Sequence, residues 1–321
     1  MSDPQSKGPW RGPLLFAIVG TITLGTIMIS FSRDARANAA APTFSEMLEE
    51  ADSVRVQFSY SSAKLPLQAI RQQQLAEAAF HWGYGEENGP STWGAHADGC
   101  NGKKQSPINI QTSKVVSRAA NALVLNWQAQ SGLIVKDTGH GIQVDNPHGG
   151  TTTFEGAQYS MLQFHFHHAS ENTIDGKQFP LEMHVVHKNA AGDLLVVGVL
   201  FANGAHNTFL SRLAWDKLPT GGRDAHNVHH DGTDATHVGT TEVPLTGAIN
   251  VLDALPQSRS YWTWPGSLTT PPCAEGVTWV LLQQTVTIGP NQVKAFPYPN
   301  NFRTVQPLNA RTVYSGSMQK R

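Results

Sequence analysis

The chain has few cysteines and little net charge. Its 321 residues include 23 Lys and Arg against 24 Asp and Glu, a formal charge of −1, and no segment gathers basic residues into a stripe. Nucleic-acid-binding domains carry such a stripe to neutralise phosphates, so the composition argues against nucleic acid as a partner. Cys100 and Cys273 are the only cysteines. Their pairing is expected in an oxidising compartment, and two separate buried thiols are the alternative.

Long apolar runs are also scarce, and an uncharged segment near the N-terminus has the features of an export signal. Lys7 and Arg11 precede residues 13–31, which carry no charge, and small residues at 35–40 have the spacing of a secretory cleavage site. About 19 uncharged residues could also just span a bilayer as an uncleaved anchor. Three threonines and two glycines dilute the segment, so we predict a cleaved signal peptide over residues 1–39 and membrane contact only if cleavage fails.

The rest of the chain divides into a short extension and one large domain. Residues 45–50 and 67–80 have helix-forming patterns, so we expect a partly helical extension over 40–80. Residues 81–321 have an ordinary apolar content, and the chain's eight Trp suit a substantial core without internal repeats. Strand-like segments are expected at 123–125, 141–145, 159–166, 181–187, 194–201 and 277–288, and helical turns at 208–218 and 251–255.

Two of these expected strands carry a histidine pattern typical of a zinc site. His165 and His167 are two residues apart, so they project from one face of a strand, and His184 follows in another strand-like run. Three neutral imidazoles from neighbouring strands suit zinc and leave its fourth position open, as in catalytic sites. Gln163 and Glu182 precede ligands by two residues, where hydrogen bonds would fix the histidine tautomers. A hydrogen-bonded structural pair is the alternative for His165 and His167.

Further motifs accompany this pattern in a fixed order along the chain. They are HWGYG at 81–85, QSPINI at 105–110, GH at 139–140, QFHFH at 163–167, SE at 170–171, EMHVVH at 182–187, SLTTPPCAEGV at 267–277, NFR at 301–303 and QPL at 306–308. Over about 240 residues the chain thus resembles an α-class carbonic anhydrase of the bacterial exported type. The resemblance implies a mainly β (α+β) fold: a large central, mostly antiparallel twisted sheet with short peripheral helices and zinc in a conical cleft.

The resemblance also implies an activity, the reversible hydration of carbon dioxide to bicarbonate and a proton by a zinc lyase. His165, His167 and His184 would hold Zn²⁺, which in carbonic anhydrases generally lowers the pKa of a bound water to about 7 and supplies the attacking hydroxide. Thr269 would accept a hydrogen bond from that hydroxide and donate one to Glu171, which orients the nucleophile because a carboxylate only accepts. The backbone N–H of Thr269 would also hold a substrate oxygen.

The remaining implied roles concern the substrate, the proton and the cell compartment. His140 would be the proton shuttle, because an exposed imidazole with a pKa near 6.5 takes and releases protons readily, and Tyr84 would complete its water network. Thr270 would line the polar side of the cleft. In bacterial members a disulfide joins the positions of Cys100 and Cys273, in agreement with a periplasmic or secreted monomer or homodimer. The apolar wall for carbon dioxide would comprise Val186, Val196, Leu268, Val277 and Trp279, for which ordinary core packing is the alternative.

Departures from the family pattern and two competing classes remain. Thr138 and Gln143 replace asparagines near the shuttle, and Trp264 replaces a tyrosine. A cupin-type metal oxygenase would use Glu171 as a further ligand and would leave the Thr-Thr-Pro-Pro segment unexplained. A non-catalytic zinc-sequestering protein would bind metal through the polar segment 221–237, which contains four histidines: His226, His229, His230 and His237. A solvated insertion between two elements is the interpretation that we favour for this segment.

Overall fold

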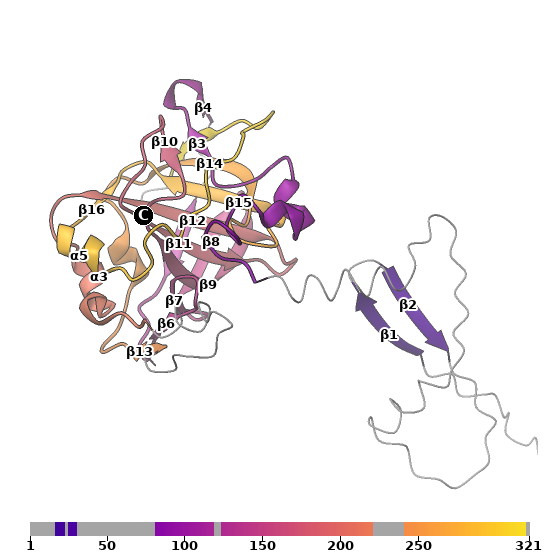
Figure 1. Cartoon of the computed structure of the whole chain (residues 1–321), viewed down its shortest axis with the longest axis horizontal. Coiled ribbons are helices and arrows are strands. Elements are labelled where there is room, and N and C mark those ends of the chain that lie inside the picture. The colour runs from indigo at the N-terminus through magenta and orange to yellow at the C-terminus, as the bar shows by residue number, and fades with distance from the viewer. Residues whose placement is uncertain (1–16, 23–24, 31–80, 119–122, 221–240, 319–321) are drawn as a thin grey trace, which may run out of the picture. The chain divides into compact units, whose positions relative to one another are not determined.

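The structure is a computed structural model that describes residues 17–22, 25–30, 81–118, 123–220 and 241–318. They belong to two compact units, within residues 1–64 and 65–321. In the first, β1 (Ala17–Ile22) and β2 (Gly25–Ser30) pair as an antiparallel hairpin inside the uncharged segment (Figure 1). None of the helices in the described residues is long and apolar enough to span a bilayer. The helices expected at 45–50 and 67–80 and the histidines of 226–237 lie outside the described residues, and signal cleavage stays a prediction.

A large twisted sheet dominates the second unit (Figure 1). Its main path runs β13-β6-β7-β9-β11-β12-β15-β14-β17-β4, with β5, β8 and β16 attached beside it. The neighbours pair antiparallel except for β12 with β15, β12 with β16, and β17 with β4. The predicted fold, mainly β with a mostly antiparallel sheet, is therefore confirmed.

The strands of this unit have the following bounds: β3 Asn109–Ile110, β4 Val116–Ser117, β5 Val124–Trp127, β6 Ile134–Asp137, β7 Ile142–Asp145, β8 Gly150–Phe154, β9 Ala157–His167, β10 Thr173–Ile174, β11 Leu181–Lys188, β12 Leu194–Asn203, β13 Glu242–Pro244, β14 Ser260–Ser267, β15 Glu275–Leu282, β16 Val286–Ile288 and β17 Tyr314–Ser317. The helices are short and peripheral: α3 Thr208–Arg212, α5 Pro290–Ala295 and the 3₁₀ turns η1 Trp93–Ala95, η2 Asp98–Asn101, η3 Thr112–Lys114, η4 Trp215–Lys217 and η5 Val251–Ala254.

Two expected elements are divided in the structure. The strand expected at 277–288 is β15 and β16, which the polar residues Gln283, Gln284 and Thr285 separate; the Gln283 side chain donates to the Tyr261 carbonyl. The helical turn expected at 208–218 is α3 and η4. Ala214 separates them with a left-handed φ of 52°, a conformation that a continuing helix does not contain.

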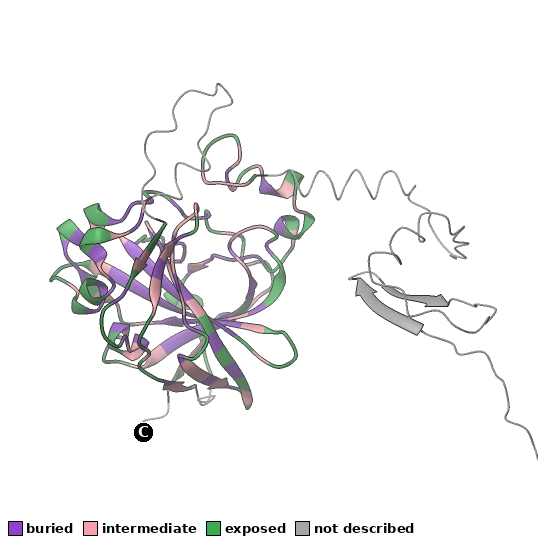
Figure 2. Ribbon diagram, turned by 90° about the horizontal axis from the view of Figure 1, so that it is seen from below, coloured by how far each residue is buried: buried purple, intermediate pink, exposed green. Residues whose placement is uncertain are grey.

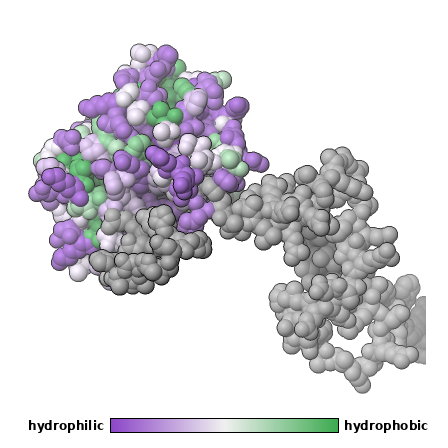
Figure 3. Space-filling view, in the orientation of Figure 1, coloured by the Kyte–Doolittle hydropathy of each residue, from purple (hydrophilic) through white to green (hydrophobic). Residues whose placement is uncertain are grey.

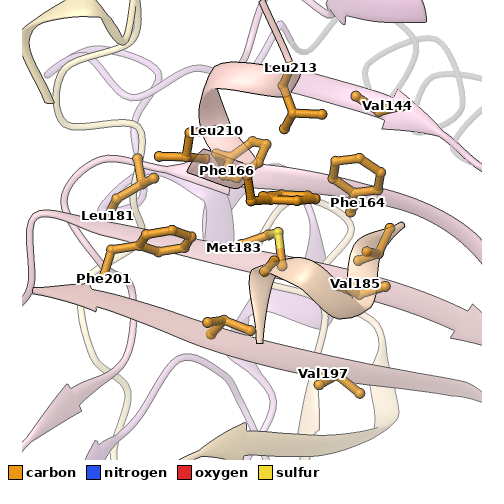
Figure 4. Packing of buried hydrophobic residues seen from close by; sticks show 14 of the residues in the cluster. Val144, Phe164, Phe166, Leu181, Met183, Val185, Val197, Phe201, Leu210 and Leu213 are labelled. Atoms are coloured by element: carbon orange, nitrogen blue, oxygen red, sulfur yellow. The ribbon is translucent and has the colours of Figure 1, made fainter. Parts of the chain in front are cut away.

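The alternation of side chains along β9 and β11 separates core from site. Phe164 and Phe166 of β9 pack with Met183 and Val185 of β11 and with residues of α3 on one face of the sheet (Figure 4). Each fully buried phenylalanine contributes about 1.5–3 kcal/mol through burial of apolar surface. Because successive strand residues point to opposite faces, His165, His167 and His184, which alternate with these core residues, project to the other face. The packing of one face thus fixes which side chains form the site.

Burial is concentrated in the central strands, as Figure 2 shows. The face of the second unit visible in Figure 3 is mainly hydrophilic, with scattered apolar residues. Among the described residues the large apolar side chains that are exposed are Val116, Leu162 and Val305. The described apolar residues therefore mostly serve the core and the site.

Candidate metal centre and active site

The three predicted ligand histidines converge on one point. His165 on β9 lies directly opposite His184 on β11, and Glu182 lies opposite His167 in the same antiparallel register. The ring centroids are 5.1 Å apart for His165 and His167, and 4.7 Å apart for His167 and His184. One nitrogen from each of the three rings lies within 4.8 Å of the others, and no other group of this kind occurs in the described part of the chain.

Each imidazole donates a hydrogen bond from the nitrogen that faces away from this point. His165 Nδ1 lies 2.8 Å from Gln163 Oε1, and His184 Nε2 lies 2.9 Å from Glu182 Oε1. His167 Nδ1 lies 2.7 Å from the Asn301 carbonyl oxygen. These oxygens only accept, so each ring carries its proton on that nitrogen. The lone pairs of His165 Nε2, His167 Nε2 and His184 Nδ1 are thereby directed to the common point, as metal binding requires.

The electrostatics of these rings suit a cation. Burial lowers the pKa of His165 and His184 well below the ordinary value, and neighbouring imidazoles lower both further. Burial also lowers the pKa of His167, whose Nε2 is buried and makes no hydrogen bond in the described structure. Neutral imidazoles retain the lone pairs that zinc needs, and an unpartnered buried nitrogen normally costs free energy. The donor set and the unpartnered Nε2 therefore fit zinc.

Two buried acidic side chains, Glu171 and Glu182, lie beside the histidines. Burial raises the pKa of Glu171 to about 8 and that of Glu182 to about 7, against hydrogen bonds that favour the ionised forms. Glu182 accepts from His184, from the Asn172 side chain, and from the backbone N–H groups of Glu171 and Asn172. Its four donors favour the carboxylate. A divalent cation among the imidazoles would likewise favour ionised Glu171, whose Oε2 lies 3.5 Å from His167 Nε2.

Thr269 lies on the loop that follows β14. The hydroxyl groups of Ser106 and Ser267 each accept from the other residue's backbone N–H, which ties the start of this loop to the 105–110 segment. Thr269 is buried, and its side chain lies near enough to Glu171 to lower the pKa of that carboxyl group, whose Oε2 has no hydrogen-bond partner among the described residues. Thr270 is half-buried. The structure thus places the predicted hydroxyl beside the predicted carboxylate.

Arg303 is a buried residue of this site for which the sequence suggested no individual role. Its backbone N–H donates to Glu171 Oε1 over 2.9 Å, and its guanidinium donates to Gln105 Oε1 and to the carbonyl oxygens of Ser106 and Cys100. Gln105 in turn donates to the carbonyl of Cys273. Arg303 therefore connects Glu171 to both ends of the disulfide.

The disulfide expected from the resemblance is present between Cys100 and Cys273, 173 residues apart in sequence. Both cysteines are buried in a small cluster around Trp93. The bond ties η2 to the loop that carries Thr269. It thus restrains this loop at its C-terminal end.

We expect reduction of this disulfide to lower the free energy of unfolding. Closing a loop of this length is worth about 5 kcal/mol in the chain-entropy model, and native disulfides commonly contribute about 2–4 kcal/mol. Urea titrations of oxidised and reduced protein measure the difference. A Cys100→Ser/Cys273→Ser variant is the control, since reductant should leave its transition unchanged. Equal stability of oxidised and reduced wild-type protein would contradict the expectation.

The five predicted apolar-wall residues share one buried cluster on the histidine side of the sheet. Trp279 packs edge-on against His184, with ring centroids 4.8 Å apart. Leu268 is partly buried and the other four are buried; the set is Val186, Val196, Leu268, Val277 and Trp279. Trp264 stacks parallel to Trp279, and its Nε1 has no hydrogen-bond partner among the described residues. The indole that replaces the usual tyrosine thus packs here without using its donor.

His140 and Tyr84 both contact a pair of tryptophans or one of them, Trp82 and Trp93. The His140 ring stacks on Trp82 with centroids 3.8 Å apart and planes at 14°. Tyr84 contacts both Trp82 and Trp93 edge-on, and burial followed by the charge of Glu171 raises its pKa well above the ordinary value. Tyr84 therefore stays protonated and close to the site. Of the other departures, Thr138 hydrogen-bonds within the His140 loop and Gln143 donates to Asp145.

Comparison with known proteins gives the family. Residues 88–317 match the family described as eukaryotic-type carbonic anhydrase. The chain is 38% identical to a carbonic anhydrase of Pectobacterium atrosepticum over 245 residues, 74% of this chain and 92% of that protein. It is 37% identical to human carbonic anhydrase 7, over 72% of this chain and 96% of the human protein.

A solved structure agrees. The Photobacterium profundum α-carbonic anhydrase is 35% identical and superposes with a TM-score of 0.61, covering 73% of this chain and all of that one (100%). The chain belongs to the α-carbonic anhydrase family. It is a carbonic anhydrase, an enzyme whose substrates are carbon dioxide and bicarbonate. The cupin alternative is therefore wrong; Glu171 Oε1 accepts from Arg303, and Glu171 is not part of the converging group.

Proposed function

We propose that His165, His167 and His184 hold one zinc ion and that the chain hydrates carbon dioxide there. The observation that carries the proposal is the convergence of three imidazoles, one half-buried and two buried, each with its outer nitrogen hydrogen-bonded to an acceptor. Zinc, when bound, lowers the pKa of a coordinated water to about 7, as in carbonic anhydrases generally, and so supplies a nucleophile at neutral pH. Gln163, Glu182 and the Asn301 carbonyl would orient the ligand rings.

The polar residues of the site orient the reactants. The Thr269 hydroxyl donates a hydrogen bond to Glu171, so the Thr269 oxygen is left to accept a hydrogen bond from the attacking oxygen. The lone pair of the attacking oxygen is thereby turned toward the substrate. The backbone N–H of Thr269 and the side chain of Thr270 hold the substrate oxygens. The five-residue apolar wall around Trp279 holds carbon dioxide, which has no net dipole, and keeps competing water away.

His140 carries the released proton to buffer, with Tyr84 supporting the water path. Two contacts support this role. The His140 ring stacks on Trp82, and Asn301 links His140 to the ligand set, because its side chain donates to the His140 carbonyl while its own carbonyl accepts from His167. Imidazole is the side chain whose charge changes nearest to neutral pH, which suits both uptake and release of a proton.

His140→Ala is expected to lower kcat by about 10-fold in dilute, bulky buffer and to leave kcat/KM near its original value. The hydration step does not use His140, whereas proton export does. Stopped-flow hydration assays measure both constants, and added imidazole should restore kcat because a free base replaces the tethered one. The exposed His148 serves as the control, since His148→Ala should leave both constants unchanged. An unchanged kcat for His140→Ala would assign proton transfer to another group.

The proposed function is tested by metal content and hydration rate in one preparation. The proposal expects one zinc per chain, loss of hydration when a chelator removes it, and recovery on adding zinc. Several metals per chain without hydration would instead favour sequestration by the segment 221–237. Hydration that survives complete metal removal would refute the proposed chemistry.

We further propose that the enzyme is exported by its N-terminal signal and works in the periplasm or outside the cell. The Cys100–Cys273 disulfide supports this, since such bonds persist in oxidising compartments. The mature protein isolated from the cell envelope or medium should begin near residue 40. A cytoplasmic enzyme that retains residues 1–39 would contradict export.

A further inference from the structure

A buried carboxylate, Asp137, anchors the loop that carries His140 to the end of β6. Asp137 ends β6 and is 8% exposed. Its Oδ1 accepts from the Gly139 backbone N–H over 2.9 Å and also from the hydroxyl of Tyr298, 161 residues further along the chain. A buried carboxylate costs free energy unless donors compensate it. Here two donors meet on one oxygen, and one of them is the backbone N–H of Gly139, the residue before His140.

The other side of His140 is fixed as well. The Asn301 side chain donates to the His140 carbonyl over 3.1 Å, and the Thr138 side chain donates to the Gly141 carbonyl over 3.0 Å. Gly139 has a φ of 81°, which lets the chain turn sharply between these anchors. The backbone on both sides of His140 is therefore held by side chains, and its ring lies flat on Trp82.

We propose that Asp137, oriented by the hydroxyl of buried Tyr298, is a positioning residue that fixes the His140 loop for proton transfer. This inference rests on the proposed role of His140. Asp137 lies on the strand before the loop, and it acts through the Gly139 peptide and not on the substrate or the ligand histidines. Without its acceptor the loop would sample more conformations, and His140 would spend less time where it receives the proton.

The kinetic test uses Tyr298→Phe and Asp137→Ala. Tyr298→Phe removes the hydroxyl but keeps the ring that packs near Phe296. Both variants are expected to lower kcat in dilute, bulky buffer by about 3-fold to 10-fold, within the range of a displaced proton carrier, and to leave kcat/KM within about 2-fold. Asp137→Asn retains an acceptor for the Gly139 N–H and should recover most of kcat. Asp145→Asn, on neighbouring β7, removes a carboxylate paired with Lys136 and is the matched control.

The decisive comparison repeats Tyr298→Phe in the His140→Ala background. If the Asp137–Tyr298 pair acts through His140, the second change should cause no further loss, because interacting residues are not additive. The same fold loss in both backgrounds, or a parallel fall in kcat/KM, would overturn the inference and leave a merely structural role.

A second measurement does not depend on activity. Backbone ¹⁵N relaxation of the Gly139, His140 and Gly141 amides should show lower order parameters in Tyr298→Phe than in wild type, with those of β9 unchanged. Unchanged order parameters in the loop would overturn the positioning role even if the wild-type protein proved unable to hydrate carbon dioxide. Absence of hydration with a loosened loop would instead count against the proposed function alone.

Discussion

Replacing His184 by alanine is expected to remove zinc and carbon dioxide hydration together. The change deletes one of three converging lone pairs and leaves Glu182 without its imidazole partner. Two remaining imidazoles cannot complete a three-ligand catalytic site, so the residual rate should approach that of buffer. The same result is expected for His165→Ala and His167→Ala. Metal analysis and stopped-flow hydration of the purified variants measure the two effects.

His206 provides the control for this prediction. It is an exposed histidine that hydrogen-bonds to Ser211, outside the converging group. His206→Ala should keep one zinc per chain and normal hydration. Stoichiometric zinc and full hydration in any of the three ligand variants would show that the metal lies elsewhere.

Thr269→Ala is expected to slow hydration by about 100-fold while the protein keeps its zinc. The loss corresponds to about 2.7 kcal/mol, the usual scale for removing one hydrogen bond that acts in the transition state. The zinc should remain because Thr269 contributes no ligand and the three imidazoles keep their outer hydrogen bonds. Both kcat and kcat/KM should fall, in contrast to His140→Ala.

Thr269→Ser is the matched variant, because it keeps the hydroxyl and removes only a methyl group. It should retain most of the activity if orientation by the hydroxyl is what matters. Loss of zinc together with activity in Thr269→Ala would mean that Thr269 supports the fold of the site. Equal impairment of the serine and alanine variants would point to packing of the methyl group.

The local pattern of the sequence predicts much of this site. The two-residue period of a strand places Phe164 and Phe166 in the core, and therefore places His165 and His167 together on the opposite face. Their pairing with His184 needed only that two strand-like runs be neighbours, as the register of β9 and β11 shows. The order of the family motifs then supplied the fold and the activity.

The contacts that complete the site come from residues with no local signal. Asn301 orients His167 through its backbone carbonyl. Every residue has such a carbonyl, so the amino-acid type at position 301 does not predict this role. Arg303 and Tyr298 act across more than 130 residues of sequence on Glu171 and Asp137. Such pairings depend on where the segment after α5 lies relative to the site. Only the folded structure shows which carbonyl and hydroxyl groups of this segment contact Asp137, His167 and Glu171.

Diffraction from crystals of the purified protein at the zinc absorption edge would locate the metal. We expect one strong anomalous peak per chain among Nε2 of His165, Nε2 of His167 and Nδ1 of His184, at about 2.0–2.1 Å from each, as for zinc–imidazole bonds generally. A protein that hydrates carbon dioxide without a peak among these three nitrogens, or with its zinc held elsewhere, would show that these histidines are not the catalytic zinc site.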